Sequence, residues 1–133
     1  MTSPQAQTPK KELHVIVHRD SLNVFAFRRD KEAEKAVDEI YKIWREKDYI
    51  MIWDHNKKPY KLSRDMPEPS DGLEVIVSGG YKYMCCSLQL YVLRKAGYNA
   101  RFHETACFDN GERMPILPDG FREVVPEYPE EKR

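Results

Sequence analysis

Residues 73–108, LEVIVSGGYKYMCCSLQLYVLRKAGYNARFHETACF, decide the fold because two apolar strand patterns flank one long helical pattern. Residues 73–77 form a short apolar run that predicts a buried strand. Residues 82–96 predict a helix that returns across a sheet, and Gly97 can take the positive φ that ends it. Residues 99–108 then predict the next strand. The stretch therefore predicts a strand–helix–strand unit.

The connection between the first strand and the helix predicts a site for a small anionic or nucleotide-like molecule. Two glycines in a tight turn let a ligand approach the backbone, and a helix start offers free N–H donors. A lysine adds positive charge, and two tyrosine rings can lie against a base. The alternative is a plain strand-to-helix connection, since the turn lacks a complete phosphate-binding motif. The predicted ligand-binding residues are Ser78, Gly79, Gly80, Tyr81, Lys82, Tyr83 and, at the end of the next strand, His103.

Two adjacent cysteines, Cys85 and Cys86, lie in the first turn of the predicted helix. The positive end of a helix dipole can lower the pKa of a thiol, so Cys85 is the candidate catalytic residue. The alternative is core packing, because Cys85 shares one helix face with Leu88 and Val92. We favour packing, since no base is evident beside the thiol in the sequence.

The same stretch resembles the nucleophile segment of the isochorismatase-like cysteine hydrolases. In that family a strand ends at a glycine, the cysteine follows at a helix start, and the helix closes with Gly-Tyr. Gly79, Cys85 and the pair Gly97-Tyr98 match these positions, and Ala106 matches the alanine that ends the next strand. The resemblance implies a thiol-dependent hydrolase on a larger doubly wound sheet, with Cys85 as nucleophile.

The family also takes a general-base aspartate from the end of its first strand and a lysine from the middle of the chain. Here the corresponding regions hold Asp20 and the lysines Lys57, Lys58 and Lys61, outside the family's local motifs. The helix end, LRKAGYNAR at residues 93–101, is also similar to the cysteine helix of transglutaminase-like enzymes. In that alignment Lys82 stands at the nucleophile position, so the two resemblances imply different chemistry.

The rest of the chain supplies further strands and one helix. Residues 30–47 show helical periodicity, and Asp30 can cap the helix. The predicted strands are residues 13–18 and 22–27, joined by a hairpin, then 49–53, and short strands at 60–63 and 114–117. This order predicts an α/β fold: a two-layer sandwich of a mixed β-sheet with two main helices, containing one C-terminal βαβ unit.

Length and composition predict one globular domain. The chain has 133 residues, and we expect a loose polar tail at 1–11, a globular part at 12–125 and a loose Pro/Glu-rich tail at 126–133. Lysine plus arginine and aspartate plus glutamate number 22 each, which makes nucleic acid an unlikely partner. The second helix is apolar nearly all round, which favours a homodimer through that helix.

Three cysteines and the absence of an export signal predict reduced thiols in a cytoplasmic protein. No stretch is apolar enough for a membrane span. His14 and His18 share a strand face without a third ligand at a recognisable spacing, so we expect no metal and no cofactor. The sequence thus predicts a small ligand-binding domain. The alternatives are a thiol-dependent hydrolase and an interaction protein that docks a macromolecule.

Overall fold

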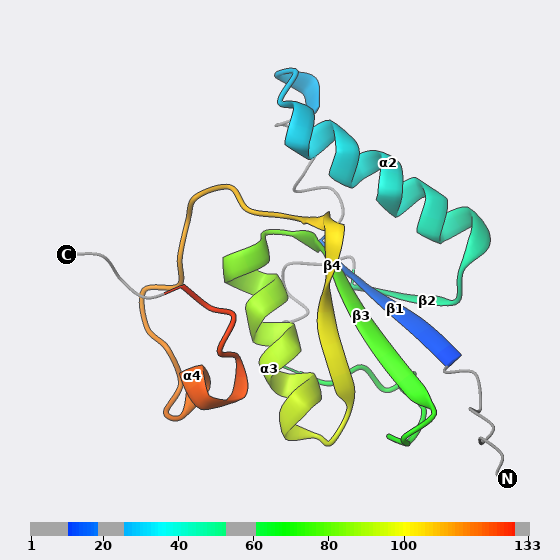
Figure 1. Ribbon diagram of the computed structural model, residues 1–133, viewed down its shortest axis with the longest axis vertical. Helices are drawn as coiled ribbons and strands as arrows, with labels where there is room; N and C mark the ends of the chain where they lie inside the picture. The colour runs from blue at the N-terminus through cyan, green and yellow to red at the C-terminus, as the bar shows by residue number, and fades with distance from the viewer. Residues whose placement is uncertain (1–10, 19–25, 53–60, 130–133) are drawn as a thin grey trace, which may run out of the picture.

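The computed structural model describes residues 11–18, 26–52 and 61–129, and it shows a parallel sheet with helices on both faces (Figure 1). The described strands lie in the order β2-β1-β3-β4, and every neighbouring pair is parallel. The elements are β1 (Lys11–Val17), α2 (Lys31–Glu46), β2 (Tyr49–Ile52), β3 (Leu73–Gly80), η2 (Lys82–Cys86), α3 (Ser87–Lys95), β4 (Asn99–Phe108) and α4 (Phe121–Val124). The α/β class and the C-terminal βαβ unit are confirmed, whereas the expected mixed sheet is parallel throughout its described strands.

The two main helices cover opposite faces of the sheet, so the fold has three layers where two were expected (Figure 1). The reason lies in the direction of the crossovers. The chain passes from β1 outward to β2 through α2, and from β3 outward in the opposite direction to β4 through α3. Because parallel crossovers are right-handed, two that run in opposite directions place their helices on opposite faces.

Alternation along the strands builds one core on each face. Leu13, Val15 and Val17 of β1 join the cluster that includes Leu90 and Leu93 of α3. Ile16 packs on the other face against a cluster from α2, which contributes Ala33, Ala36, Ile40 and Ile43. Burial of each large aliphatic side chain contributes about 1.5–3 kcal/mol, so both helices are held mainly by these clusters.

Helix α2 is confirmed with the predicted cap. The carboxylate of Asp30 accepts hydrogen bonds from the backbone N–H groups of Glu32 and Ala33, at 3.0 and 3.1 Å. Of the apolar residues that give residues 30–47 their helical periodicity, Ala33 and Ile40 are buried, whereas Val37 and Trp44 are only half-buried.

The hairpin predicted after β1 is wrong. Residues 14–17 of β1 pair in parallel with β2 on one edge and with β3 on the other, so no edge remains for a returning strand. Of the strand predicted at 22–27, Ala26 and Phe27 are helical and the rest lies outside the described residues. Residues 61–63 and 114–117 form no strand either, and Tyr60 lies outside the described part.

The C-terminal segment packs against α3. Tyr91 of α3 contacts Phe121, with ring centroids 5.3 Å apart, and both Phe121 and Tyr128 are buried. The Arg94 guanidinium donates to both carboxylate oxygens of Glu127, at 2.8 and 2.6 Å. The globular part therefore extends at least to residue 128, beyond the predicted boundary at 125. This packing also covers part of the apolar surface of α3 within one chain.

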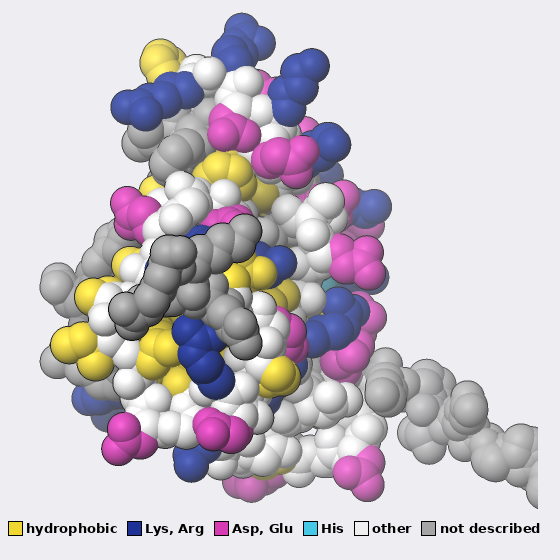
Figure 2. Space-filling view, turned by 60° about the vertical axis from the view of Figure 1, so that its left-hand side comes forward, with side chains coloured by type: hydrophobic (Ala, Val, Ile, Leu, Met, Phe, Trp, Pro, Cys, Tyr) yellow, Lys and Arg dark blue, Asp and Glu magenta, His cyan; other side chains and the backbone are white. Residues whose placement is uncertain are grey.

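On the face that includes this segment, apolar side chains lie among basic and acidic ones (Figure 2). None of the helices in the described part of the chain has the length and apolar character needed to cross a membrane.

Candidate functional site

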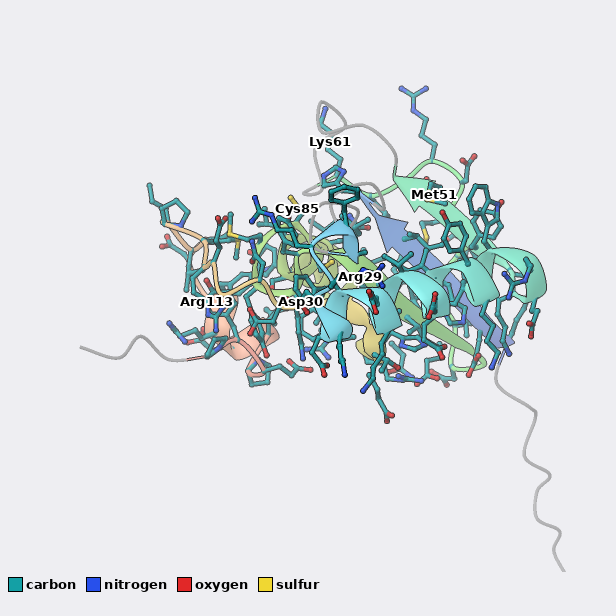
Figure 3. All side chains as sticks on the ribbon, turned by 90° about the horizontal axis from the view of Figure 1, so that it is seen from above. Arg29, Asp30, Met51, Lys61, Cys85 and Arg113 are labelled. Carbon is teal, nitrogen blue, oxygen red and sulfur yellow. The ribbon has the colours of Figure 1, made fainter. Side chains whose placement is uncertain are left out.

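The carboxyl edge of the sheet contains a topological switch point between β1 and β3. These strands are neighbours, yet their connections leave in opposite directions and on opposite faces. In open parallel sheets such a point leaves a crevice outside the strand ends, and ligands bind there. Figure 3 views the molecule from this side and labels Cys85 and Lys61.

The predicted glycine turn is in fact the end of β3. Ser78, Gly79 and Gly80 belong to the strand, and all three are buried. Gly79 has φ 111°, and a Cβ at this position would lie 1.9 Å from the carbonyl oxygen of Val17. Glycine is therefore required by the close approach of β1, and the predicted tight turn is wrong because these residues continue the strand.

The helix that follows starts irregularly. Lys82–Cys86 is π-helical, Tyr83 and Met84 have non-helical backbone angles, and regular α-helix begins only at Ser87. The backbone N–H groups of Met84 and Cys86 both donate to the carbonyl of Tyr81, at 3.1 and 3.2 Å. These two donors are thus already bonded within the chain, which weakens the predicted anion site at the helix start.

Lys82 and Tyr83 belong to a cluster of rings and cations. The Lys82 ammonium lies 5.2 Å from the ring centre of Tyr83 and 5.3 Å from that of Phe102. The Arg113 guanidinium lies 4.6 Å from the Tyr83 ring centre, and Tyr128 meets the same ring edge to face at 5.7 Å. This cluster packs the C-terminal segment onto the sheet, so its contacts have a structural explanation without a ligand.

Among the predicted binding residues, Tyr81 stays at the edge. Its side chain is half-buried and meets Phe108, the last residue of β4, with ring centroids 6.3 Å apart. Burial raises the pKa of Tyr81, so the phenol is neutral at pH 7.

The three cysteines differ in exposure. Cys86 and Cys107 are buried, and the thiol of Cys86 lies 3.7 Å from the carbonyl oxygen of Ser78 as a donor. Cys85 is half-buried, as are Leu88 and Val92, while Cys86, Leu90 and Leu93 fill the core. The helix face predicted to pack in the core, that of Cys85, Leu88 and Val92, is therefore not the buried one. The buried face begins one residue later, at Cys86.

Burial raises the pKa of the Cys85 thiol, and it raises that of Cys86 well above the ordinary value. The environment of Cys85 thus favours the neutral thiol, which is the opposite of what an activated nucleophile requires.

Part of the triad implied by the resemblance lies outside the described residues, namely Asp20, Lys57 and Lys58. The remaining lysine, Lys61, is exposed, and its carbonyl accepts a hydrogen bond of 3.5 Å from the Gln89 amide. Gln89 lies one helical turn after Cys85, so the segment at Lys61 runs beside the same side of the helix. At the end of β1, His18 is buried and has φ 44°.

His103 does not lie at the carboxyl edge with the other predicted residues. Val77 pairs with Phe102, and Gly79 pairs with Cys107, so the four residues 103–106 stand opposite Ser78 alone. In this wide bulge the His103 Nδ1 accepts hydrogen bonds from the N–H groups of Thr105 and Ala106, at 3.1 and 3.0 Å. The expected alternation of side chains through His103 and Thr105 is therefore replaced by a bulge.

The bulge directs His103 into a groove beneath α2. The His103 ring lies 6.1 Å, between centroids, from that of His14 on β1, and both line a cavity of about 470 Å³. Burial lowers the pKa of each histidine. Within the described parts of the chain, no group of three or more His, Cys, Asp or Glu side chains is placed to hold a metal ion.

A wider groove of about 1050 Å³ lies at the opposite edge of the sheet. It is lined by the first residues of three strands, Lys11, Tyr49 and Leu73, and by part of the loop before β3. Ligands of open parallel sheets bind at the carboxyl edge, so the size of this groove does not make it the better candidate.

The fold is that of a small α/β domain whose described strands form an open parallel sheet. The chain matches no protein-family model, no curated protein and no solved structure.

Proposed function

We propose that this domain binds a small anionic or nucleotide-like molecule at the carboxyl edge of its sheet, in the crevice between β1 and β3. The observation that carries the proposal is the switch point, where α2 and α3 leave the sheet on opposite faces. The half-buried ring of Tyr81 borders this edge, packed against the buried Phe108, and it suits a planar group in the ligand.

Binding without chemistry is better supported than catalysis. A cysteine nucleophile needs a lowered pKa, whereas burial raises the pKa of Cys85. Cys86 and Cys107 are buried and cannot meet a substrate without local opening.

Tyr81 offers the direct test. AMP, nicotinamide and inorganic phosphate should be added separately to the full chain, and the melting temperature should rise with the concentration of at least one of them. Tyr81→Leu keeps most of the apolar volume but removes the ring, so a ring-containing probe should bind it at least about tenfold more weakly.

The matched control is Tyr41→Leu, which removes a 42% exposed tyrosine from α2. It should leave the ligand-induced rise unchanged. If none of the three probes raises the melting temperature of the unmodified protein, or if both variants respond alike, the site is not at this edge.

A thiol-dependent hydrolase is the second candidate function. One observation favours it: Cys85 is the half-buried cysteine of the three, and it follows the strand that borders the switch point. The segment at Lys61 runs beside the same helix through its hydrogen bond with Gln89. This candidate predicts a reactive Cys85, which the labelling experiment in the Discussion measures.

A further inference from the structure

The sheet face beneath the C-terminal half of α2 presents the polar residues His14 and Arg101 on either side of the buried Ile76, where a covered face should be apolar throughout. His14 pairs with Ile76, and Ile76 pairs with Arg101, so these three side chains form one row across the sheet. Further along β1 the same face presents Ile16, which packs on α2 as expected. The change along this covered face, from Ile16 to His14 and Arg101, is not explained by apolar packing against α2.

A groove separates this polar row from α2. Its volume of about 470 Å³ lies within the range of about 300–1,000 Å³ that small-molecule sites occupy. Its floor comes from β1, β3 and β4, and its other wall from α2 and the residue that ends it. The lining includes Glu12, His14, Glu39, Lys42, Arg101 and His103.

His14 is the buried polar group of this groove. The side chain is 4% exposed, and neither ring nitrogen has a hydrogen-bond partner among the described residues. The nearest carboxylate oxygen, on Glu12, lies 3.6 Å from Nε2. Buried polar atoms are almost always hydrogen-bonded, so a molecule in the groove would supply the hydrogen bonds that the described residues, apart from the distant Glu12 carboxylate, do not give His14.

His103 presents a defined donor to the same space. Its Nδ1 accepts two backbone N–H groups, so in the neutral ring the proton lies on Nε2. Burial lowers the pKa of this histidine, which keeps the ring neutral at pH 7. An Nε2 that carries a proton donates a hydrogen bond and does not ligate a metal, which points to an organic ligand with an acceptor group.

Both signs of charge surround the histidines. The carboxylates that line the groove are Glu12, Glu39, Glu46 and Glu104, and the cations are Lys42, Lys47 and Arg101. A purely anionic ligand would meet the four carboxylates, and a purely cationic ligand would meet the three cations. A small molecule that carries one charge of each sign can pair with both sets.

We propose that this groove binds a small zwitterion of the amino-acid class. The ligand carboxylate accepts hydrogen bonds from the His103 Nε2–H group and the Arg101 guanidinium. The ligand ammonium group faces the carboxylates of Glu12 and Glu39, and His14 contacts the part between them. This site lies on the face of the sheet, apart from the carboxyl edge assigned above, so either site can be present without the other.

Histidine ring signals in two-dimensional ¹H–¹³C NMR spectra of the full chain test the proposal, because the chain has only 4 histidines. The common α-amino acids serve as probes at pH 7. The signals of His14 and His103 should shift together and saturate with at least one amino acid, while those of His18 should not move. The corresponding amine and carboxylic acid, each with one charge, should bind at least about tenfold more weakly.

Two variants locate the contacts. Arg101→Gln removes a partner of the carboxylate and should weaken binding about tenfold, whereas Lys35→Gln on the exposed side of α2 should have no effect. Arg101 is 43% exposed and its Nε donates to the Glu74 carboxylate at 3.2 Å, so its replacement removes that surface ion pair as well but leaves the core intact. The proposal fails if no amino acid shifts both histidines, if the amine or the acid binds as tightly as the zwitterion, or if Arg101→Gln binds like the unmodified protein.

Discussion

At the scale of single residues, the neighbours Cys85 and Cys86 differ because one helical position separates a half-buried site from the core. Cys86 joins the buried cluster beneath α3, while Cys85 lies at its margin. The sequence placed both near a helix start but could not assign the core face, because the first turn is π-helical and rotates the following positions.

This difference predicts how the thiols react with iodoacetamide. Burial raises the pKa of Cys85, so its thiolate fraction near pH 7 is small and labelling should be slow until the pH exceeds the ordinary value of 9.0. Cys86 should react only on unfolding, since its thiol is fully buried. Peptide mass spectrometry of the labelled, folded protein between pH 6 and pH 10 measures both rates.

The matched variant is Cys86→Ala, which leaves Cys85 as the reactive thiol of its pair and removes ambiguity in assigning the adduct. Rapid labelling of Cys85 with a midpoint below pH 8 would contradict the raised pKa of this thiol and the preference for binding without catalysis. That result would favour the hydrolase candidate instead.

Gly79 and His103 show what residue-level reasoning missed. Gly79 was assigned to ligand contact, yet the steric conflict with Val17 depends on a strand more than sixty positions earlier in the chain. His103 was assigned to the carboxyl edge, but the bulge places it in the groove beneath α2. Both features depend on long-range strand pairing, which local sequence patterns do not contain.

At the scale of elements, prediction succeeded where the signals are local. Helix α2 has periodic apolar residues, a capping aspartate and acidic residues in its first turn, and it forms as predicted. The strand–helix–strand unit of residues 73–108 is likewise present. The short strands at 60–63 and 114–117 rested on a few apolar residues beside prolines and turns, and their described parts are irregular.

The cap of α2 gives a quantitative prediction. Asp30→Ala removes the acceptor for two backbone N–H groups and should lower the free energy of unfolding by about 1 kcal/mol. Urea unfolding followed by circular dichroism measures the change. Asp30→Ser retains an acceptor and should recover most of the loss, whereas equal losses in both variants would show that the cap does not stabilise α2.

At the scale of the whole molecule, the parallel sheet follows from connections that each contain a helix or a long loop. Parallel neighbours need such crossovers, and the right-handed rule then assigns α2 and α3 to opposite faces. The sequence contained both helices, but the hairpin assumed after β1 turned a parallel arrangement into a mixed one. The candidate groove could not be predicted either, because it joins residues from β1, β4 and α2.

Residues after 125 contribute to the folded core through the buried side chain of Tyr128. Tyr128 is 4% exposed, its ring meets Tyr83 and Phe121 at 5.7 and 5.3 Å, and its hydroxyl accepts the Met114 N–H at 2.8 Å. Removing a buried aromatic ring costs about 3–5 kcal/mol, so Tyr128→Ala should lower the free energy of unfolding by roughly that amount.

Urea unfolding measures this change in the free energy of unfolding, and Tyr41→Ala on the exposed side of α2 is the control for loss of a tyrosine. A loss below about 1 kcal/mol, similar to a surface substitution, would mean that the packing of Tyr128 contributes little to stability. A loss of about 3–5 kcal/mol would show that the contacts of this segment with Tyr83 and Phe121 stabilise the fold as a core residue does.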